Sequence, residues 1–239
     1  RIQNMSMGLK LQIEQLEKFS ADVSHELKNP LTSLQSAIDL IDTNNIDEDK
    51  KNLLIKNIKN DLKRMNQLIT DISNFTRLKA EIELEKNQYI KLNDFFNEIP
   101  RIFTNNNKGL KLIFKKHTED FEILGNKNKL IQVFINLIDN SISMSPERSK
   151  ILIQLGKVDE KFISIRFYDQ GKGVDLKDSE KIFERFYSDR QENLKNHTGL
   201  GLSIAREIIE HMKGSISLVK SNKSDYPGAC FFIILPIKQ

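Results

Sequence analysis

The second half of the chain carries oxygen ligands and glycines at spacings that suit a phosphate-bearing ligand. Asn136 and Asn140 lie four residues apart and therefore share one face of a helix. Their amide oxygens suit Mg²⁺, a hard cation that prefers oxygen ligands and keeps several of its waters. Because asparagine is abundant throughout this chain, the pair alone predicts little.

A carboxylate and two glycines directly follow a strand-like run, as Asp169, Gly171 and Gly173. A carboxylate at this place can accept a hydrogen bond from a donor group of a ligand. The glycines permit positive φ and a close approach of the backbone. An Asp-x-Gly-x-Gly string on its own, however, is more often a turn than a binding site.

Another glycine string opens the last helical pattern of the chain. Glycines at a helix N-terminus expose backbone N–H groups at the positive end of the helix dipole, where phosphate binds. The polar residues 188–198 just before it are predicted to form a mobile lid, which Phe183 and Phe186 anchor. The string is Thr198-Gly199-Leu200-Gly201.

A single histidine in the first half also has a chemical reading. His25 stands between the apolar positions Val23 and Leu27 and is predicted to face solvent. Alone it would be a plain surface residue, although neutral imidazole offers a lone pair near pH 7. Pro30 makes the segment less ordinary, because a proline inside a helix removes a hydrogen bond and kinks the axis at a cost of about 3 kcal/mol.

Two long helical patterns must position this histidine. Apolar residues recur at steps of three and four from Ile2 to Ile41 and from Leu54 to Phe75, with a polar break from Asp42 to Asp49. These stripes predict an antiparallel helical hairpin with a coiled-coil-like seam. Because a lone hairpin buries little, we expect two copies to pair into a four-helix bundle.

The rest of the chain mixes strands and helices without strict alternation. This mixture predicts an α/β sandwich with helices on one face of a sheet, so the fold class of the chain is α+β. Residues near 79–88 form the joint between the two parts. The strand-like runs are Leu110 to Phe114, Phe121 to Leu124, Ile151 to Leu155, Phe162 to Phe167, Ser215 to Val219 and Cys230 to Leu235. The helical patterns are Leu92 to Phe103, Lys127 to Met144 and Leu200 to Met212.

Composition narrows the class of protein. Of 239 residues, 38% are hydrophobic and 29% charged, as in soluble globular proteins, and no run reaches the roughly 18 apolar residues that cross a bilayer. The 37 basic and 33 acidic residues are interspersed, which gives a nucleic-acid role little support. The lone Cys230 fits a reducing compartment and a buried apolar position.

The string His25-Glu26-Leu27-Lys28-Asn29-Pro30-Leu31 resembles the phosphoacceptor box of bacterial sensor histidine kinases. The strings around Asn136, Asp169, Phe183 and Gly199 resemble the ATP-binding domain of that family and occur in its order. The resemblance covers about residues 1–239. It implies the end of a signalling linker helix at 1–17, a dimerisation and phosphotransfer domain at 18–80, and a catalytic ATP-binding domain at 86–239.

By this resemblance the chain autophosphorylates on His25 from Mg-ATP and passes the phosphoryl group to an aspartate of a response regulator receiver domain. Glu26 would hydrogen-bond the other ring nitrogen and take up its proton, and Asn29 would hold water for dephosphorylating the regulator. Asn140 would ligate Mg²⁺. The nucleotide-binding set would be Asn136, Asn140, Asp169, Gly171, Gly173, Phe183, Thr198, Gly199, Leu200 and Gly201. The family also implies a homodimer and a membrane-anchored parent, with this chain as its cytoplasmic portion.

Two departures leave alternatives open. Ser143 and Met144 stand where many members carry a basic and an aromatic residue. A charge contact to the triphosphate is therefore missing, or a basic residue elsewhere supplies it. A degenerate kinase that acts as a non-catalytic dimeric scaffold is one alternative. A related ATPase of the chaperone or DNA-repair type is another, but it lacks the box around His25. The basic residues that could supply the charge contact to the triphosphate are Lys172, Arg185, Arg190 and Lys195.

Overall fold

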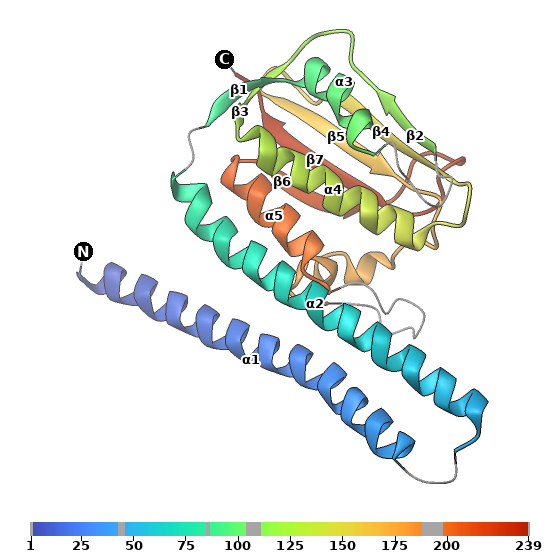
Figure 1. Ribbon diagram of the computed structural model, residues 1–239. Helices are drawn as coiled ribbons and strands as arrows, with labels where there is room; N and C mark the ends of the chain where they lie inside the picture. Colours follow the sequence, from blue (N-terminus) through green and yellow to red (C-terminus); the bar gives the residue numbers. More distant parts are fainter. Residues whose placement is uncertain (1, 43–45, 85–86, 104–110, 188–197, 239) are drawn as a thin grey trace. The chain divides into compact units, whose positions relative to one another are not determined.

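A computed structural model of the chain describes residues 2–42, 46–84, 87–103, 111–187 and 198–238. The chain divides into two compact units. One contains helix α1 and most of helix α2, and the other contains the strands and the remaining helices (Figure 1).

The helical unit rests on two long helices, α1 (Ile2–Ile41) and α2 (Glu48–Leu84). α2 begins inside the predicted polar break, where Glu48 and Asp49 place negative charge at the positive end of its dipole. α1 continues through Pro30. Because proline has no N–H, the helical hydrogen bond to the carbonyl of Glu26, four residues earlier, is missing.

The sheet unit is built on a five-stranded sheet with the order β2-β4-β5-β7-β6. β2 and β4 are parallel, and the other neighbours are antiparallel. The strands of this sheet are β2 (Lys111–Lys115), β4 (Lys150–Lys157), β5 (Phe162–Tyr168), β6 (Ser215–Val219) and β7 (Cys230–Pro236). A separate antiparallel pair joins β1 (Gln88–Lys91) and β3 (Glu122–Gly125).

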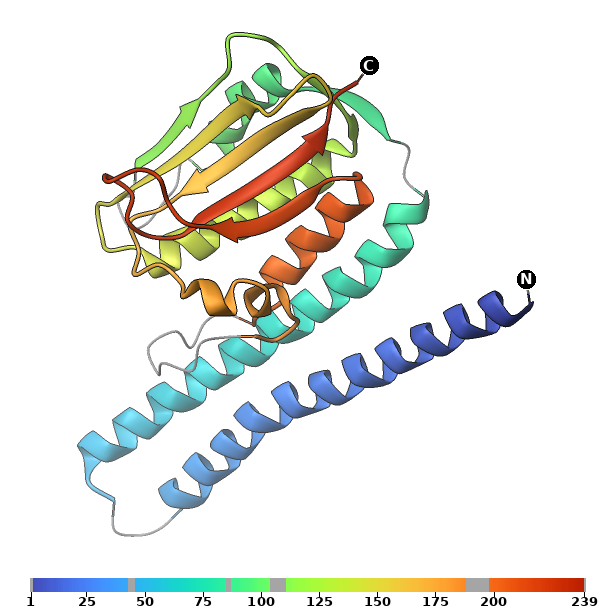
Figure 2. The ribbon, with the colours of Figure 1, turned by 180° about the vertical axis from the view of Figure 1, so that it is seen from behind.

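Helices cover one face of the large sheet, as Figures 1 and 2 show from opposite sides. They are α3 (Leu92–Ile102), α4 (Lys127–Met144) and α5 (Gly201–His211). Two short 3-10 helices, η1 (Leu176–Asp178) and η2 (Lys181–Phe183), precede α5. α4 begins at a side-chain cap, where Oδ1 of Asn126 accepts hydrogen bonds from two backbone N–H groups.

The core lies between these helices and the sheet. Ile153, Phe167 and Phe231 are cross-strand neighbours on β4, β5 and β7, and all three are fully buried. The ring of Phe134 on α4 packs on Phe167, with its centroid 4.9 Å from that of Phe167 and 5.0 Å from that of Phe95 on α3. This two-layer packing confirms the predicted α+β sandwich that follows a helical hairpin.

The structure differs from the predicted elements at a few places. β1 was not predicted, because only Ile90 of its four residues is buried and no alternation is visible. Leu110 and residues 188–197 of the predicted lid lie outside the described residues. No helix in the described ranges combines the length and the apolar character that a membrane span requires.

Candidate functional site

His25 lies on the exposed surface of α1, as predicted. Its Nδ1 is 3.5 Å from Nδ2 of Asn29, one turn further along the helix. The two residues therefore share one side of the helix. Asn29 therefore lies against the Nδ1 side of the ring, and Nε2 lies on the other side.

Glu26 points toward the partner helix rather than into solvent. Its Oε2 accepts a 3.3 Å hydrogen bond from Nη2 of Arg64 on α2, and both side chains are part-buried. In this conformation His25 therefore contacts Asn29, and Glu26 contacts Arg64. The predicted role of Glu26 toward the ring of His25 stays a prediction.

In the sheet unit, Asp169 lies just beyond the end of β5 and is 1% exposed. Its Oδ1 accepts two backbone hydrogen bonds of 2.9 Å, from the N–H groups of Gly171 and Ala229. Burial raises the pKa of this carboxyl above its ordinary value, while the Gly171 and Ala229 amides and the nearby Ser141 hydroxyl act in the opposite direction. The buried carboxylate is thus held in one orientation by backbone groups.

Asn136 connects α4 to the start of α5. Its Nδ2 donates a 2.9 Å hydrogen bond to the carbonyl oxygen of Gly201, the first residue of α5. Asn140, one turn further along α4, is half-buried, and its side-chain amide has no partner within the described parts of the chain. The helix thus presents one asparagine that holds α5 and one whose oxygen is available to a ligand.

Two of the predicted glycines stand where a side chain cannot fit. A Cβ on Gly171 would lie 2.8 Å from the carbonyl oxygen of Met144 at the end of α4. Gly199 has φ +73°, and its Cβ would lie 2.6 Å from the backbone of Phe186. The N–H of Phe186 also donates to the carbonyl of Gly199 at 3.0 Å. Backbone contacts therefore join the chain on the two sides of residues 188–197.

The remaining predicted residues have varied surroundings. Gly173 is exposed and has φ +75°, and Leu200 is fully buried directly before α5, which has no side-chain cap. Phe183 is core: its centroid lies 6.3 Å from that of Phe231, and the Arg206 guanidinium stacks on it. Thr198 belongs to the helical unit, whereas the other residues predicted to bind the nucleotide belong to the sheet unit.

These groups fit a magnesium-bound adenine nucleotide. The hydroxyl oxygen of Ser141, beside Asp169, is buried without a well-formed hydrogen bond to any described residue, so a polar ligand group can satisfy it. The described residues contain no cluster of three or more His, Cys, Asp or Glu side chains that could hold a metal. A cation here would depend on an amide oxygen, water and phosphate, which is the coordination that Mg²⁺ accepts.

Two family models match most of the chain between them. The His Kinase A (phospho-acceptor) domain matches residues 15–81, and the Histidine kinase-, DNA gyrase B-, and HSP90-like ATPase matches residues 125–239. Together they contain His25, Asp169 and both asparagines. The chain belongs to the sensor histidine kinases.

Individual relatives agree with this assignment to the sensor histidine kinases. Sensor protein ChvG of Rhizobium meliloti is 36% identical over 248 residues, which cover 98% of this chain and 43% of that protein. ChvG of Agrobacterium fabrum is 34% identical over 251 residues, which cover 100% of this chain and 42% of that protein. The chain thus spans less than half the length of these two relatives.

A solved structure shows the same fold. Histidine kinase ThkA, in complex with response regulator protein TrrA, matches with a TM-score of 0.65 and 24% identity over 96% of this chain and 64% of that chain. At this identity the likeness concerns the fold alone.

Ser143, at the position where many histidine kinases carry a basic residue, forms a hydrogen bond within its own helix. The hydroxyl of Ser143 donates a 2.8 Å hydrogen bond to the carbonyl oxygen of Asn140 and is thus used within α4. Met144 is 37% exposed, and its carbonyl closely approaches Gly171. Neither residue supplies a charge, and the replacement of that charge by another basic residue stays a prediction.

Sequence reasoning missed three residues that surround the carboxylate of Asp169. They are Ser141, Gly228 and Ala229, which contact or face Asp169. Pro227-Gly228 is a turn signal before β7, but nothing in it indicates a ligand. Pairing of β5 with β7 brings this turn to Asp169, and that pairing is not visible in the sequence.

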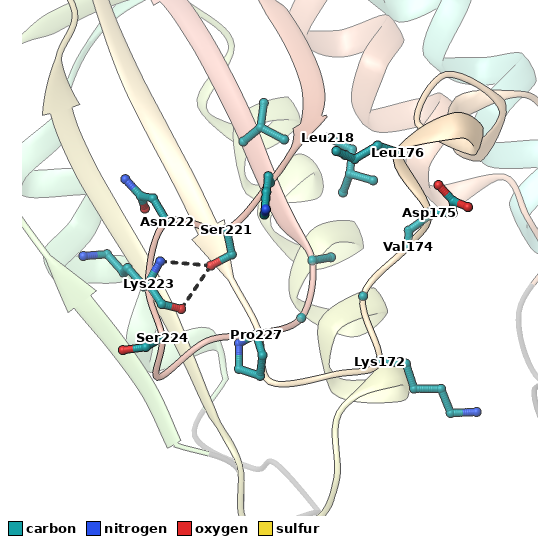
Figure 3. Close-up of a pocket in the computed structure, with 15 residues that line it drawn as sticks. Lys172, Val174, Asp175, Leu176, Leu218, Ser221, Asn222, Lys223, Ser224 and Pro227 are labelled. Carbon is teal, nitrogen blue, oxygen red and sulfur yellow. Dashed lines mark hydrogen bonds between the residues drawn. The ribbon is translucent and has the colours of Figure 1, made fainter.

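A groove of about 670 Å³ lies between residues 172–176 and the β6–β7 connection (Figure 3). Apolar side chains gather at one end of it, whereas Lys172 and Lys223 point away. Neither Asp169 nor the two asparagines line it. Gly173 of the predicted nucleotide-binding set lines the groove, as do Gly228 and Ala229, which lie against Asp169. The groove therefore borders the candidate nucleotide site.

Proposed function

We propose that this chain is an ATP-dependent protein-histidine kinase that phosphorylates His25 and passes the phosphoryl group to an aspartate of a response regulator receiver domain. The observation that carries the proposal is an exposed imidazole on one unit together with a buried, backbone-held carboxylate on the other. The first is a reachable nucleophile, and the second is an acceptor for the amino group of adenine.

The sheet unit would hold the nucleotide through groups that differ in chemistry. Asp169 accepts from the adenine amino group, and Asn140 offers its amide oxygen to Mg²⁺. Asn136 holds the start of α5, whose first N–H groups face the phosphates. The bound nucleotide supplies the γ-phosphorus as the electrophile. Positioning and electrostatics dominate phosphoryl transfer, so these residues act mainly by orientation.

The helical unit would form the dimer that the family implies. Many apolar residues of the predicted seam stay exposed in the single chain, and exposed stripes at helical spacing favour pairing. Burying them against a second copy would form a four-helix bundle. The exposed seam residues are Ile13 (49%), Leu16 (67%), Leu31 (57%), Ile38 (46%), Leu62 (49%) and Ile69 (51%).

Two further statements belong to the whole protein. The matched ChvG relatives are named sensor proteins and are more than twice as long as the matched region. We infer that the parent of this chain is anchored in the plasma membrane, with this part on the cytoplasmic side. Asn29, beside the imidazole, would serve in dephosphorylation of the regulator.

The proposal is tested by incubating the chain with γ-labelled ATP and Mg²⁺ and then adding purified receiver domains. We expect label on the chain first and on a cognate receiver afterwards. A chain that binds ATP but takes no label would instead be the non-catalytic scaffold. The family match and the intact set of site residues favour the enzyme over that scaffold.

A further inference from the structure

An ion pair crosses the helical hairpin beside the phosphoacceptor. Nη2 of Arg64 on α2 lies 3.3 Å from Oε2 of Glu26 on α1. The two side chains are only 27% and 21% exposed. Both residues belong to the same compact unit, so this contact does not depend on where the sheet unit lies. A partly buried pair is screened by salt less than a fully exposed pair.

The arrangement is poorly suited to stability alone. The Nε of Arg64 is buried and has no hydrogen-bond partner among the described residues. A partly buried pair with an unsatisfied donor gains little over well-packed apolar residues. Glu26 uses only Oε2 here, and its Oε1 has no partner in the parts of the chain that are described. The carboxylate is therefore anchored at one oxygen and has the other one available.

The tautomer of His25 decides whether the ring can react through Nε2. A carboxylate that accepts from Nδ1–H leaves the lone pair on Nε2. An amide that donates to Nδ1, as Nδ2 of Asn29 would at 3.5 Å, instead places the proton on Nε2. The contact with Asn29 would thus favour the tautomer opposite to the one that a carboxylate accepting from Nδ1–H, as predicted for Glu26, would favour.

We propose that Arg64 is a positioning residue that holds Glu26 by Oε2, so that Oε1 can accept the Nδ1 proton of His25. This inference rests on the proposed function. In the step, Nε2 forms a bond to the γ-phosphorus while the bond from that phosphorus to the bridging oxygen of ADP breaks. ADP keeps that electron pair, and the Nδ1 proton passes to Oε1 of Glu26. Arg64 acts through Glu26, much as a third group orients the base of a catalytic triad.

The first test is the ring itself, without nucleotide. With only four histidines in the chain, ¹⁵N-histidine labelling resolves the His25 ring. Arg64→Met removes the charged guanidinium group but keeps an unbranched, mainly aliphatic side chain. We expect it to lower the Nδ1–H fraction of His25, and we expect Arg64→Lys to restore part of it. An unchanged tautomer ratio in Arg64→Met would overturn the proposal.

The second test is the rate of autophosphorylation in a double-mutant cycle. We expect Arg64→Met to slow labelling roughly 10- to 100-fold, part of what a positioned base contributes. In the Glu26→Gln background, Arg64→Met should have no further effect. Equal slowing in both backgrounds would mean that Arg64 does not act through Glu26, and the proposal would fail.

The matched control is a second side-chain hydrogen bond that crosses the hairpin. The hydroxyl of Ser33 donates a 2.7 Å hydrogen bond to Oδ2 of Asp61. Ser33→Ala should change neither the tautomer nor the labelling rate. If Ser33→Ala matched Arg64→Met in both, a structural role would explain the effect instead. If the wild type took no label, the proposed function would fail. The tautomer measurement would still show whether Arg64 acts on the ring of His25 through Glu26.

Discussion

The backbone N–H of Ala229 donates a 2.9 Å hydrogen bond to Oδ1 of Asp169, which lies sixty residues earlier in the chain. The two meet because Tyr168, the last residue of β5, pairs with Cys230, the first residue of β7. The N–H of Gly171 donates to the same oxygen. The orientation of the carboxylate is therefore fixed by the sheet and its turns, and not by another mobile side chain.

Replacing Asp169 with asparagine tests the adenine role. In Asp169→Asn one carboxylate oxygen becomes an NH₂ group, so a donor faces the donor amino group of adenine. Leaving such groups unpaired costs about 1–3 kcal/mol, so we expect nucleotide affinity to fall roughly 5- to 150-fold. Calorimetry with a non-hydrolysable ATP analogue measures it. Unchanged affinity would count against the adenine contact.

The raised pKa of Asp169 predicts a dependence on pH. Between the ordinary Asp value of 3.8 and the raised value, the folded chain binds a proton that the unfolded chain has released. The contribution of this group to folding stability therefore falls as pH rises through that window. The acceptor for adenine is lost in the opposite direction, as pH falls. As pH falls through the range just above 3.8, we expect the affinity of the wild type for the ATP analogue to weaken. We expect the affinity of Asp169→Asn not to change with pH in this way. Identical pH profiles for wild type and variant would contradict the assignment.

Gly228 is the residue of this site least visible in the sequence. A Cβ there would lie 1.9 Å from Oδ1 of Asp169 and 2.6 Å from the N–H nitrogen of Gly171. We expect Gly228→Ala to abolish nucleotide binding and to destabilise the sheet unit by about 1–3 kcal/mol, as overpacking does. Gly156→Ala is the control, because its Cβ would meet only Ser164 Oγ at 3.2 Å. Thermal unfolding with and without nucleotide compares them, and equal behaviour of the two variants would refute this account.

Local pattern was enough to predict most of the elements. Periodic apolar residues indicated α4 and the buried strands, because a face that packs on a core repeats at a fixed spacing. The contacts that complete the site were not predictable in this way. Glu26 meets Arg64 only through the register of the hairpin, and Asp169 meets Ala229 only through the pairing of β5 with β7. Such long-range registers leave no mark on the spacing of nearby residues.

Cys230 should be chemically inert in the folded chain. It is 1% exposed, and burial raises the pKa of its thiol to about 11. Thiolate is the reactive form, so at pH 8 we expect a thiol reagent to react about 100-fold more slowly than in denaturant. Because the chain has one cysteine, the absorbance of the leaving group that a chromogenic disulfide reagent releases reports the reaction of Cys230 alone. Fast reaction of the native chain would show that the strand opens.

Asn29 is expected to act in one activity and not in the other. Asn29→Ala removes the amide 3.5 Å from Nδ1 of His25. We expect dephosphorylation of the receiver domain to fall at least tenfold, while autophosphorylation persists, since this amide is not needed to carry the proton from Nδ1. Release of label from a phosphorylated receiver measures the first, and labelling of the chain the second. Parallel loss of both activities would contradict the division of roles.

The central claim is that His25 receives the phosphoryl group. The most direct measurement is to label the chain from γ-labelled ATP and Mg²⁺, then locate the label in wild type and His25→Gln by peptide mapping under alkaline conditions. We predict an acid-labile label on the peptide that contains His25, and no label on His25→Gln, which still binds the ATP analogue with wild-type affinity. Label retained by His25→Gln would contradict the account.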